Sequence, residues 1–303
     1  MIRAMDVFRT PDERFDDLPG WDFPPQYVDV DGLRIHHVDV APDGPPTGGP
    51  IVLFHGEPTW SYLYRRMIRP LAAAGHRVIA HDHAGFGRSD KPTDRDWYSF
   101  DRHSAIADAV LDHLEVTDAT VVVQDWGGPI GLRWATEHRD RVANLVIMNT
   151  GLFSGRVSRG FLAWRDFAAK NPDLPVGRII QGATVTDVPA EVIAAYDAPF
   201  PTVESKAGAA QFPLLVPVEE SDPGAEVLRG VADVLSRWEV PTLLAFSDSD
   251  PVFPHPKSGQ VFTDLIPTAG EQVTVAGAAH FLQEDKGEEI AAHIVGFLHE
   301  GGV

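Results

Sequence analysis

Residues 121–128 read VVVQDWGG, and this stretch decides the fold. The three valines predict a buried strand, because a short run of β-branched residues is typical of the interior of a sheet. Gly127 and Gly128 then indicate a sharp turn, and the apolar spacing of residues 130–138 is that of a helix. Asp125 therefore stands at a tight bend between a strand and a helix, where a side chain can be exposed above the end of a sheet.

Similar strand and helix patterns alternate on both sides of this bend. The expected strands cover residues 51–55, 77–82, 119–125, 145–149, 241–247 and 271–277, and the expected helices cover 62–74, 102–114, 130–138 and 284–298. Continuous apolar strands separated by helices indicate a mostly parallel central sheet with helices on both faces. Nearer the N-terminus, the alternating runs Tyr27–Val30 and Leu33–Val40 flank Asp31-Gly32, which predicts an antiparallel hairpin.

The pattern changes between residues 152 and 222. This part contains helical segments, aromatic residues and prolines, but no convincing buried strand. The simplest interpretation is a helical insertion in an α/β domain, because the alternation of strands and helices resumes after it. We therefore predict a core domain formed by residues 1–151 and 223–303, and an inserted helical cap domain formed by residues 152–222.

The composition restricts the possible partners. The 303 residues include 44 acidic and 25 basic side chains, which gives a formal net charge of −19. A surface this acidic repels nucleic acids and anionic membranes. Cysteine is absent, which excludes disulfides and thiolate catalysis, and no apolar run is long enough for a signal sequence or a transmembrane helix. We expect a cytoplasmic monomer that binds neither nucleic acid nor membranes.

Asp125 is the candidate nucleophile. An aspartate after a strand is more often a helix N-cap, but a carboxylate needs no general base to become nucleophilic at neutral pH. Its attack on a saturated carbon gives an alkyl ester that water can hydrolyse, whereas its attack on an ester would give an anhydride. Aspartate at this bend therefore favours cleavage of a carbon–halogen bond or an epoxide over ester hydrolysis.

His280 is the candidate general base. It follows the last expected strand, in VAGAAHFLQED, and comes after the nucleophile in the chain. The acid that orients it is expected between the two, in FSDSDPVFP. Asp250 is preferred because the following proline restricts the turn, and Asp248 is the alternative. Asn149, at the end of another strand, occupies a third possible position but cannot act as an anion.

The segment HGEPTW (residues 55–60) follows the first buried strand. We expect the backbone N–H of Glu57 to be one donor of an oxyanion hole, and the N–H of Trp126, directly after the nucleophile, to be the second. The Glu57 side chain is a candidate to hold the hydrolytic water.

Taken together, these motifs resemble the haloalkane dehalogenases of the α/β-hydrolase superfamily. The resemblance spans nearly the whole chain and rests on HGEPTW (55–60), DHAGFGRSDKP (82–92), QDWGG (124–128), DSDP (248–251) and GAAHF (277–281). These segments look closest to the subfamily with an Asp-His-Asp triad and two halide-binding tryptophans. His83 and Ala84 are modest departures that we expect to affect packing only.

The resemblance also implies where a halide binds. In that family the halide rests between two indole N–H groups, one from the residue after the nucleophile, here Trp126. The other comes from the cap, where FLAW ends in Trp164. Phe161, Phe212 and Pro213 are expected to line the substrate pocket by similarity. The implied reaction converts a haloalkane into an alcohol, a halide ion and a proton, with no metal or organic cofactor.

Three other functions stay open at this point. Epoxide hydrolases also use an aspartate followed by tryptophan, but they bind the epoxide oxygen with two cap tyrosines, and only Tyr196 lies in the expected cap. A fluoroacetate dehalogenase would need arginines after the nucleophile, where Trp126 and Gly127 stand. A protein of this fold that binds a ligand without turnover is the non-catalytic alternative, although every catalytic position here is filled.

Overall fold

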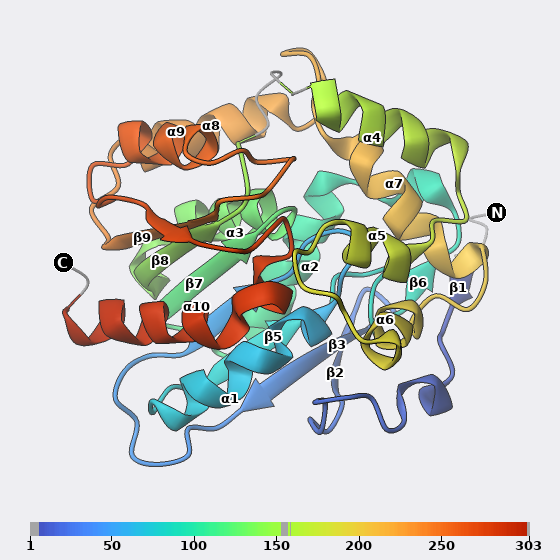
Figure 1. The fold of residues 1–303 in the computed structure, drawn as a ribbon, viewed down its shortest axis with the longest axis horizontal. Helices are drawn as coiled ribbons and strands as arrows, with labels where there is room; N and C mark the ends of the chain where they lie inside the picture. Colours follow the sequence, from blue (N-terminus) through green and yellow to red (C-terminus); the bar gives the residue numbers. More distant parts are fainter. Residues whose placement is uncertain (1–5, 153–156, 158, 302–303) are drawn as a thin grey trace.

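The computed structural model describes residues 6–152, 157 and 159–301. Its main sheet has eight strands in the order β10-β9-β8-β7-β4-β5-β3-β2 (Figure 1). These strands are β2 (Gln26–Val30), β3 (Leu33–Val40), β4 (Ile51–Phe54), β5 (Val78–His81), β7 (Ala119–Gln124), β8 (Val142–Met148), β9 (Thr242–Ser247) and β10 (Val273–Val275). The short strands β1 (Val7–Phe8) and β6 (Lys91–Pro92) form a second, two-stranded sheet.

The strands from β10 to β5 all run parallel to their neighbours, whereas β3 is antiparallel to both β5 and β2. This confirms the predicted hairpin and the mostly parallel sheet. At the hairpin turn, φ is +53° for Asp31 and +78° for Gly32. Positive φ at both central residues is the geometry of the tight turn that best matches strand twist, and aspartate followed by glycine accommodates it.

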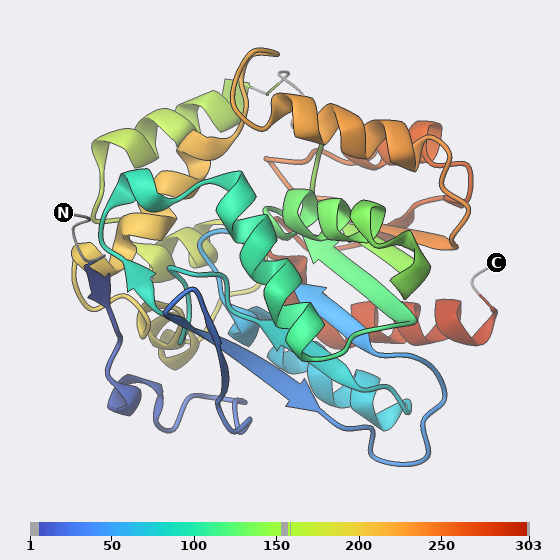
Figure 2. The ribbon, with the colours of Figure 1, turned by 180° about the vertical axis from the view of Figure 1, so that it is seen from behind.

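Helices cover both faces of the sheet. Side chains of a strand alternate between the two faces: Val122 packs in the cluster formed with α1 and α10, whereas Val121 and Val123 pack in the cluster formed with helices of the opposite face. Figure 1 shows α1 and α10 on the face of the sheet that is turned toward the viewer. Figure 2 shows the opposite face, which α2 and α3 cover. The helices are α1 (Arg65–Ala73), α2 (Phe100–His113), α3 (Gly127–Glu137), α8 (Ala225–Leu235), α9 (Lys257–Leu265) and α10 (Leu282–His299).

The chain leaves the sheet after β8 and forms helices before it returns at α8. These helices are α4 (Arg159–Lys170), α5 (Val176–Gly182), α6 (Ala190–Asp197) and α7 (Ala207–Leu215). Helix α4 packs against α7, and α5 packs against α6. No strand occurs among the described residues between 152 and 222. This supports the division that we propose, a core of residues 1–151 and 223–303 with a helical cap of residues 152–222.

Several elements differ in detail from their expected bounds. The expected helix 62–74 is divided into the 3-10 turn η2 (Ser61–Tyr64) and α1, and β8 begins at Val142 rather than 145. Helices α8 and α9 lie outside the helices that the sequence predicts. Within the described ranges, no helix combines the length and apolar character needed to cross a membrane.

Candidate active site

Asp125 lies at the bend between β7 and α3 with a left-handed backbone conformation, φ +48°. Its backbone N–H donates to the Asn149 carbonyl at 3.0 Å, and the Gly128 N–H donates to the Asp125 carbonyl at 2.9 Å. A Cβ on Gly127 would lie 2.1 Å from the Phe54 carbonyl oxygen, so glycine is required for α3 to approach β4. Positive φ in a residue other than glycine is uncommon and is concentrated at functional sites.

The Asp125 carboxylate faces two groups from other loops. Its Oδ1 accepts a hydrogen bond from the Glu57 backbone N–H at 2.7 Å, and its Oδ2 lies 3.6 Å from Nε2 of His280. Gly56 permits this approach, because a Cβ there would lie 2.4 Å from the Asp125 Cβ. The two carboxylate oxygens therefore have different surroundings: one is held by an amide, and the other faces the imidazole.

Asp250 orients His280. The Nδ1 of His280 lies 2.9 Å from Oδ2 of Asp250, whose side chain is fully buried. The other carboxylate oxygen accepts backbone N–H groups from Val252 at 2.6 Å and Phe253 at 3.1 Å. Because the carboxylate is itself fixed and engages Nδ1, it holds the ring with Nε2 toward Asp125.

The other two positions considered for the orienting acid lie away from the imidazole. Asp248 is exposed and accepts the Gly277 N–H at 3.0 Å. Asn149 is buried, and its Nδ2 donates to the Ser247 hydroxyl at 2.7 Å and to the backbone carbonyl of His280 at 3.2 Å. Asn149 thus holds the backbone of the His280 loop, and of the three candidates the structure brings only Asp250 to the ring.

The surroundings of His280 favour its protonated form. Burial lowers the pKa of the imidazole, but the charge and hydrogen bond of Asp250 and the nearby carboxylate of Asp125 outweigh burial and raise that pKa to about 10. An imidazolium between two carboxylates is therefore the state that this geometry stabilises.

Glu57 is buried beside Asp125. Burial and the Asp125 charge raise the pKa of the Glu57 carboxyl well above its ordinary value, and His280 opposes them only in part. The neutral carboxyl is therefore favoured, and this form has an O–H donor. Its Oε1 is buried with no protein hydrogen-bond partner among the described residues. Because Glu57 also lines the adjacent cavity, it offers a polar group to a small molecule such as water.

A cavity of about 260 Å³ opens next to Asp125. The charged or titratable side chains of its wall are those of Glu57, Asp125 and His280. These three residues lie next to one another, because both Glu57 and His280 are close to the Asp125 carboxylate. A small, mostly apolar cavity with a few converging polar groups suits a small apolar molecule. In the part of the chain that is described, no group of three or more His, Cys, Asp or Glu side chains could hold a metal ion. The cavity is lined by Glu57, Pro58, Asp125, Trp126, Gly160, Phe161, Trp164, Ile179, Ala183, Pro213, Val216, Pro251, Val252, Phe253, His280 and Phe281.

The two tryptophans expected to bind halide both line this cavity. Trp126, directly before α3, is buried and packs edge-to-face on Phe212, with ring centroids 5.1 Å apart. Trp164, on α4, is half-buried and stacks on Phe167 at 5.8 Å. One indole therefore comes from the core and one from the cap, on the same cavity as Asp125.

Of the pocket residues expected by similarity, Phe161 and Pro213 line the cavity, and Phe212 is not among the lining residues. The buried ring of Phe212 packs against Trp126 and, on another side, against Phe86 at 4.7 Å. Consecutive residues of α7 point in different directions, so Pro213 reaches the cavity while Phe212 supports the Trp126 ring.

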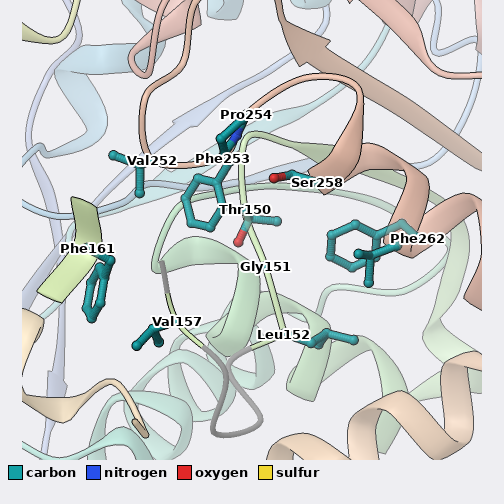
Figure 3. Close-up of a pocket in the computed structure, with 11 residues that line it drawn as sticks. Thr150, Gly151, Leu152, Val157, Phe161, Val252, Phe253, Pro254, Ser258 and Phe262 are labelled. Carbon is teal, nitrogen blue, oxygen red and sulfur yellow. The ribbon is translucent and has the colours of Figure 1, made fainter. Parts of the chain in front are cut away.

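A second pocket of about 230 Å³ adjoins this cavity (Figure 3). The two share Phe161, Val252 and Phe253 as walls. The Phe253 ring points into the second pocket (Figure 3) and also stacks on the His280 ring, with centroids 5.8 Å apart. The second pocket therefore extends the mostly apolar cavity beyond the Phe253 ring, which packs on the imidazole of His280. The other lining residues of the second pocket are Thr150, Gly151, Leu152, Val157, Pro254, Ser258, Val261 and Phe262.

Sequence reasoning missed Asp285, which lies close to the site. Its buried carboxylate accepts the N–H of Ala279, the residue before His280, at 2.9 Å. The only signal was the acidic pair that ends HFLQED, which is equally typical of the negative charges found in the first turn of a helix.

Comparisons with known proteins confirm the predicted α/β-hydrolase fold. Residues 49–188 match the family model described as alpha/beta hydrolase fold. A haloalkane dehalogenase from Psychrobacter cryohalolentis is 46% identical over 98% of this chain and 99% of the relative. One from Mycobacterium marinum is 47% identical over 96% of this chain and 99% of the relative. Among solved structures, the tetrameric haloalkane dehalogenase DpaA from Paraglaciecola agarilytica superposes with a TM-score of 0.89 at 34% identity, covering 95% of this chain and 97% of that chain.

Proposed function

This chain belongs to the haloalkane dehalogenases, hydrolases that act on carbon–halide bonds, and on that premise we propose that it cleaves haloalkanes through a covalent alkyl ester on Asp125. The observation that carries the proposal is the setting of the Asp125 carboxylate. One oxygen accepts the Glu57 N–H, and the other faces His280 at the wall of an apolar cavity.

In the first step, Oδ2 of Asp125 attacks the carbon that bears the halogen. A carbon–oxygen bond forms, and the carbon–halogen bond breaks with its electron pair on the departing halide. The indole N–H groups of Trp126 and Trp164 are assigned to hold this halide. An indole donates to an anion without accepting, and its ring excludes water, so both features favour the departing ion.

In the second step, His280 takes a proton from water. Esterification neutralises Asp125, which removes one of the two charges that raise the pKa of His280, so the imidazolium releases its proton to solvent and the neutral ring can then accept one. The water oxygen attacks the ester carbonyl carbon of Asp125. The resulting oxyanion on Oδ1 keeps the Glu57 N–H, which lies 2.7 Å away in the free carboxylate, and the Trp126 N–H is assigned as the second donor.

Collapse of this intermediate breaks the bond between the carbonyl carbon of Asp125 and the alkyl oxygen, and the imidazolium of His280 gives its proton to that oxygen to release the alcohol. The new carboxyl of Asp125 then passes its proton to His280, which restores the carboxylate and the imidazolium. The neutral carboxyl of Glu57 is assigned to hold the attacking water. The proposed substrates are uncharged haloalkanes, since none of the described lining residues is a lysine or an arginine that could pair with a charged substrate. A cytoplasmic monomer stays our prediction.

The variant His280→Phe tests this mechanism. The wild type should release halide continuously from short bromo- and chloroalkanes, which a protein that only binds ligands would not do. His280→Phe should release a single equivalent of halide and then stall, and mass spectrometry should find the alkyl ester on the peptide that contains Asp125. The exposed His299→Phe serves as the matched control and should turn over normally. Sustained turnover by His280→Phe would overturn the assigned base.

The epoxide hydrolase alternative has little support in this geometry. The hydroxyl of Tyr196, the tyrosine of the expected cap, donates to Oε2 of Glu284 at 2.6 Å in a buried position. No tyrosine is found among the described residues that line the cavity, so none is offered to an epoxide oxygen. Styrene oxide belongs in the substrate panel, because turnover of the epoxide without halide release from bromoalkanes would reverse the assignment.

A further inference from the structure

We propose that Asp285 is a positioning residue that holds the His280 loop against the cap and thereby sets the rate of ester hydrolysis. It acts through His280 and does not line the substrate cavity. The inference rests on the proposed function, in which His280 is the base of the second step only.

The Asp285 carboxylate joins two loops that are far apart in the chain. Its Oδ2 accepts the Ala279 N–H at 2.9 Å, on the His280 loop. Its Oδ1 accepts the Thr186 N–H at 2.7 Å, and the Val185 N–H lies 3.0 and 3.1 Å from the two oxygens. A buried carboxylate that accepts several backbone N–H groups makes charge-assisted, directional hydrogen bonds.

The cap loop is also tied to the other side of His280. The Phe281 N–H donates to the Ala183 carbonyl at 3.2 Å. The imidazole is thus flanked by Ala279 and Phe281, and each of these residues is anchored, directly or through Asp285, to the segment 183–186. Because Ala183 and Phe281 both line the cavity, one set of hydrogen bonds places the base and a wall of the cap together.

The neighbouring Glu284 makes a useful contrast. Its carboxylate pairs with Arg65 at 2.6 Å and accepts the Tyr196 hydroxyl, so it joins the cap helix α6 to the core. None of these side-chain contacts reaches the His280 loop. Loss of the Glu284 charge should therefore weaken the fold, whereas loss of the Asp285 charge should displace the base.

The variant Asp285→Asn keeps the size of the side chain but turns one acceptor oxygen into an amide donor that faces backbone N–H groups. We expect the rate constant of ester formation, measured as halide release in a single turnover, to keep its wild-type value, because Asp125 is not displaced. The rate constant of ester hydrolysis should fall about ten- to a hundredfold, since a small misplacement of a catalytic group has an effect of that order. Rapid-quench kinetics with 1-bromobutane measure both steps, and the ester on Asp125 should accumulate.

Two control variants separate positioning from general destabilisation. Glu284→Gln should lower the melting temperature while keeping the ratio of the two rate constants, and the exposed Glu289→Gln should change neither. The inference is overturned if Asp285→Asn keeps both wild-type rate constants, or if both fall together with the folded fraction. If Asp285→Asn does not fold, Asp285→Ser is measured against the same criteria.

The experiments separate failure of the proposed function from failure of the positioning role of Asp285. Absence of halide release from the wild type would remove the proposed function itself. If wild type and His280→Phe behave as proposed while the Asp285 variants hydrolyse the ester normally, only the positioning role is lost.

Discussion

The core side and the cap side of the cavity hold their functional side chains in different ways. On the core side, Asp125 and Asp250 are anchored by backbone N–H groups and by the imidazole of His280. On the cap side, Trp164 is half-buried on α4, a helix in which Ala168 is the buried residue, and it rests on Phe167 through ring stacking. Hydrogen bonds of the core therefore fix the proposed nucleophile and the proposed orienting acid, where small displacements are costly, and the cap supplies an aromatic wall.

The largest expected effect is on the core side. Asp125→Ala removes the proposed nucleophile, so halide release should fall by at least about 10⁴-fold, as for removal of a nucleophile in other covalent enzymes. Halide release under single-turnover conditions measures this, with the thermal transition recorded to show that the variant is folded. Residual activity near a tenth of wild type would show that the carboxylate is not the nucleophile.

A slightly smaller loss is expected when the anchor of the base is changed. Asp250→Asn places an amide N–H₂ against Nδ1 of His280 and favours the wrong imidazole tautomer, so turnover should fall about 10³- to 10⁴-fold. Steady-state halide release measures the effect. Asp248→Asn, at the exposed alternative position, is the matched control and should stay near wild type. Equal losses in both variants would contradict the assignment of Asp250.

On the cap side, we expect a more modest effect from Trp164→Phe. The change keeps the aromatic ring but removes the indole N–H, and a hydrogen bond to an ion contributes about 1.5–3 kcal/mol, so the halide dissociation constant should rise about ten- to a hundredfold. Quenching of tryptophan fluorescence by bromide measures it. Trp97→Phe, half-buried and not among the described cavity residues, is the control. Unchanged binding in Trp164→Phe would move the second donor to another residue.

The smallest effect is expected in the pH dependence of stability. The pKa of His280 is raised from 6.5 to about 10 by its two carboxylate neighbours, against the effect of burial. Its contribution to stability is therefore fully present below about pH 6.5, where the unfolded histidine is also protonated, and is lost as the pH rises to about 10.

The melting temperature of wild type minus that of His280→Gln should accordingly decrease between pH 6.5 and pH 10. Trp164→Phe, a change on the cap side, should follow the wild-type pH dependence. A difference that stays constant with pH would show that His280 is not protonated in the resting site.

The candidate site was predictable where its signals are local. The bend at Asp125 follows from an apolar run and two glycines, and the choice of Asp250 over Asp248 follows from the proline after it. The direction in which each side chain points was harder to predict from the sequence. Phe212 and Pro213 are adjacent in sequence, but only Pro213 lines the cavity, because neighbouring positions on a helix point apart.

The contacts of Asp285 could not be predicted from the sequence for a different reason. Its carboxylate binds Val185, 100 residues away in the chain, and no local period encodes which loop a buried carboxylate will meet. Asn149 is a similar case. Its position at the end of a strand was visible in the sequence, but its bond to the His280 carbonyl depends on the strand order β10-β9-β8, which brings the loop after β10 to the end of β8.

The sequence by itself determined the order of strands and helices, the bend that carries a carboxylate instead of a hydroxyl, and the residue types available for the chemistry. These follow from periodicity and turn preferences, which act over a few neighbouring residues. Only the tertiary structure decided that one oxygen of Asp125 meets an amide and the other an imidazole, that burial and the Asp125 charge raise the pKa of the Glu57 carboxyl, and that a cap loop is hydrogen-bonded to Phe281, beside His280. Those properties arise from distances and desolvation between distant segments, which exist only once the chain is packed.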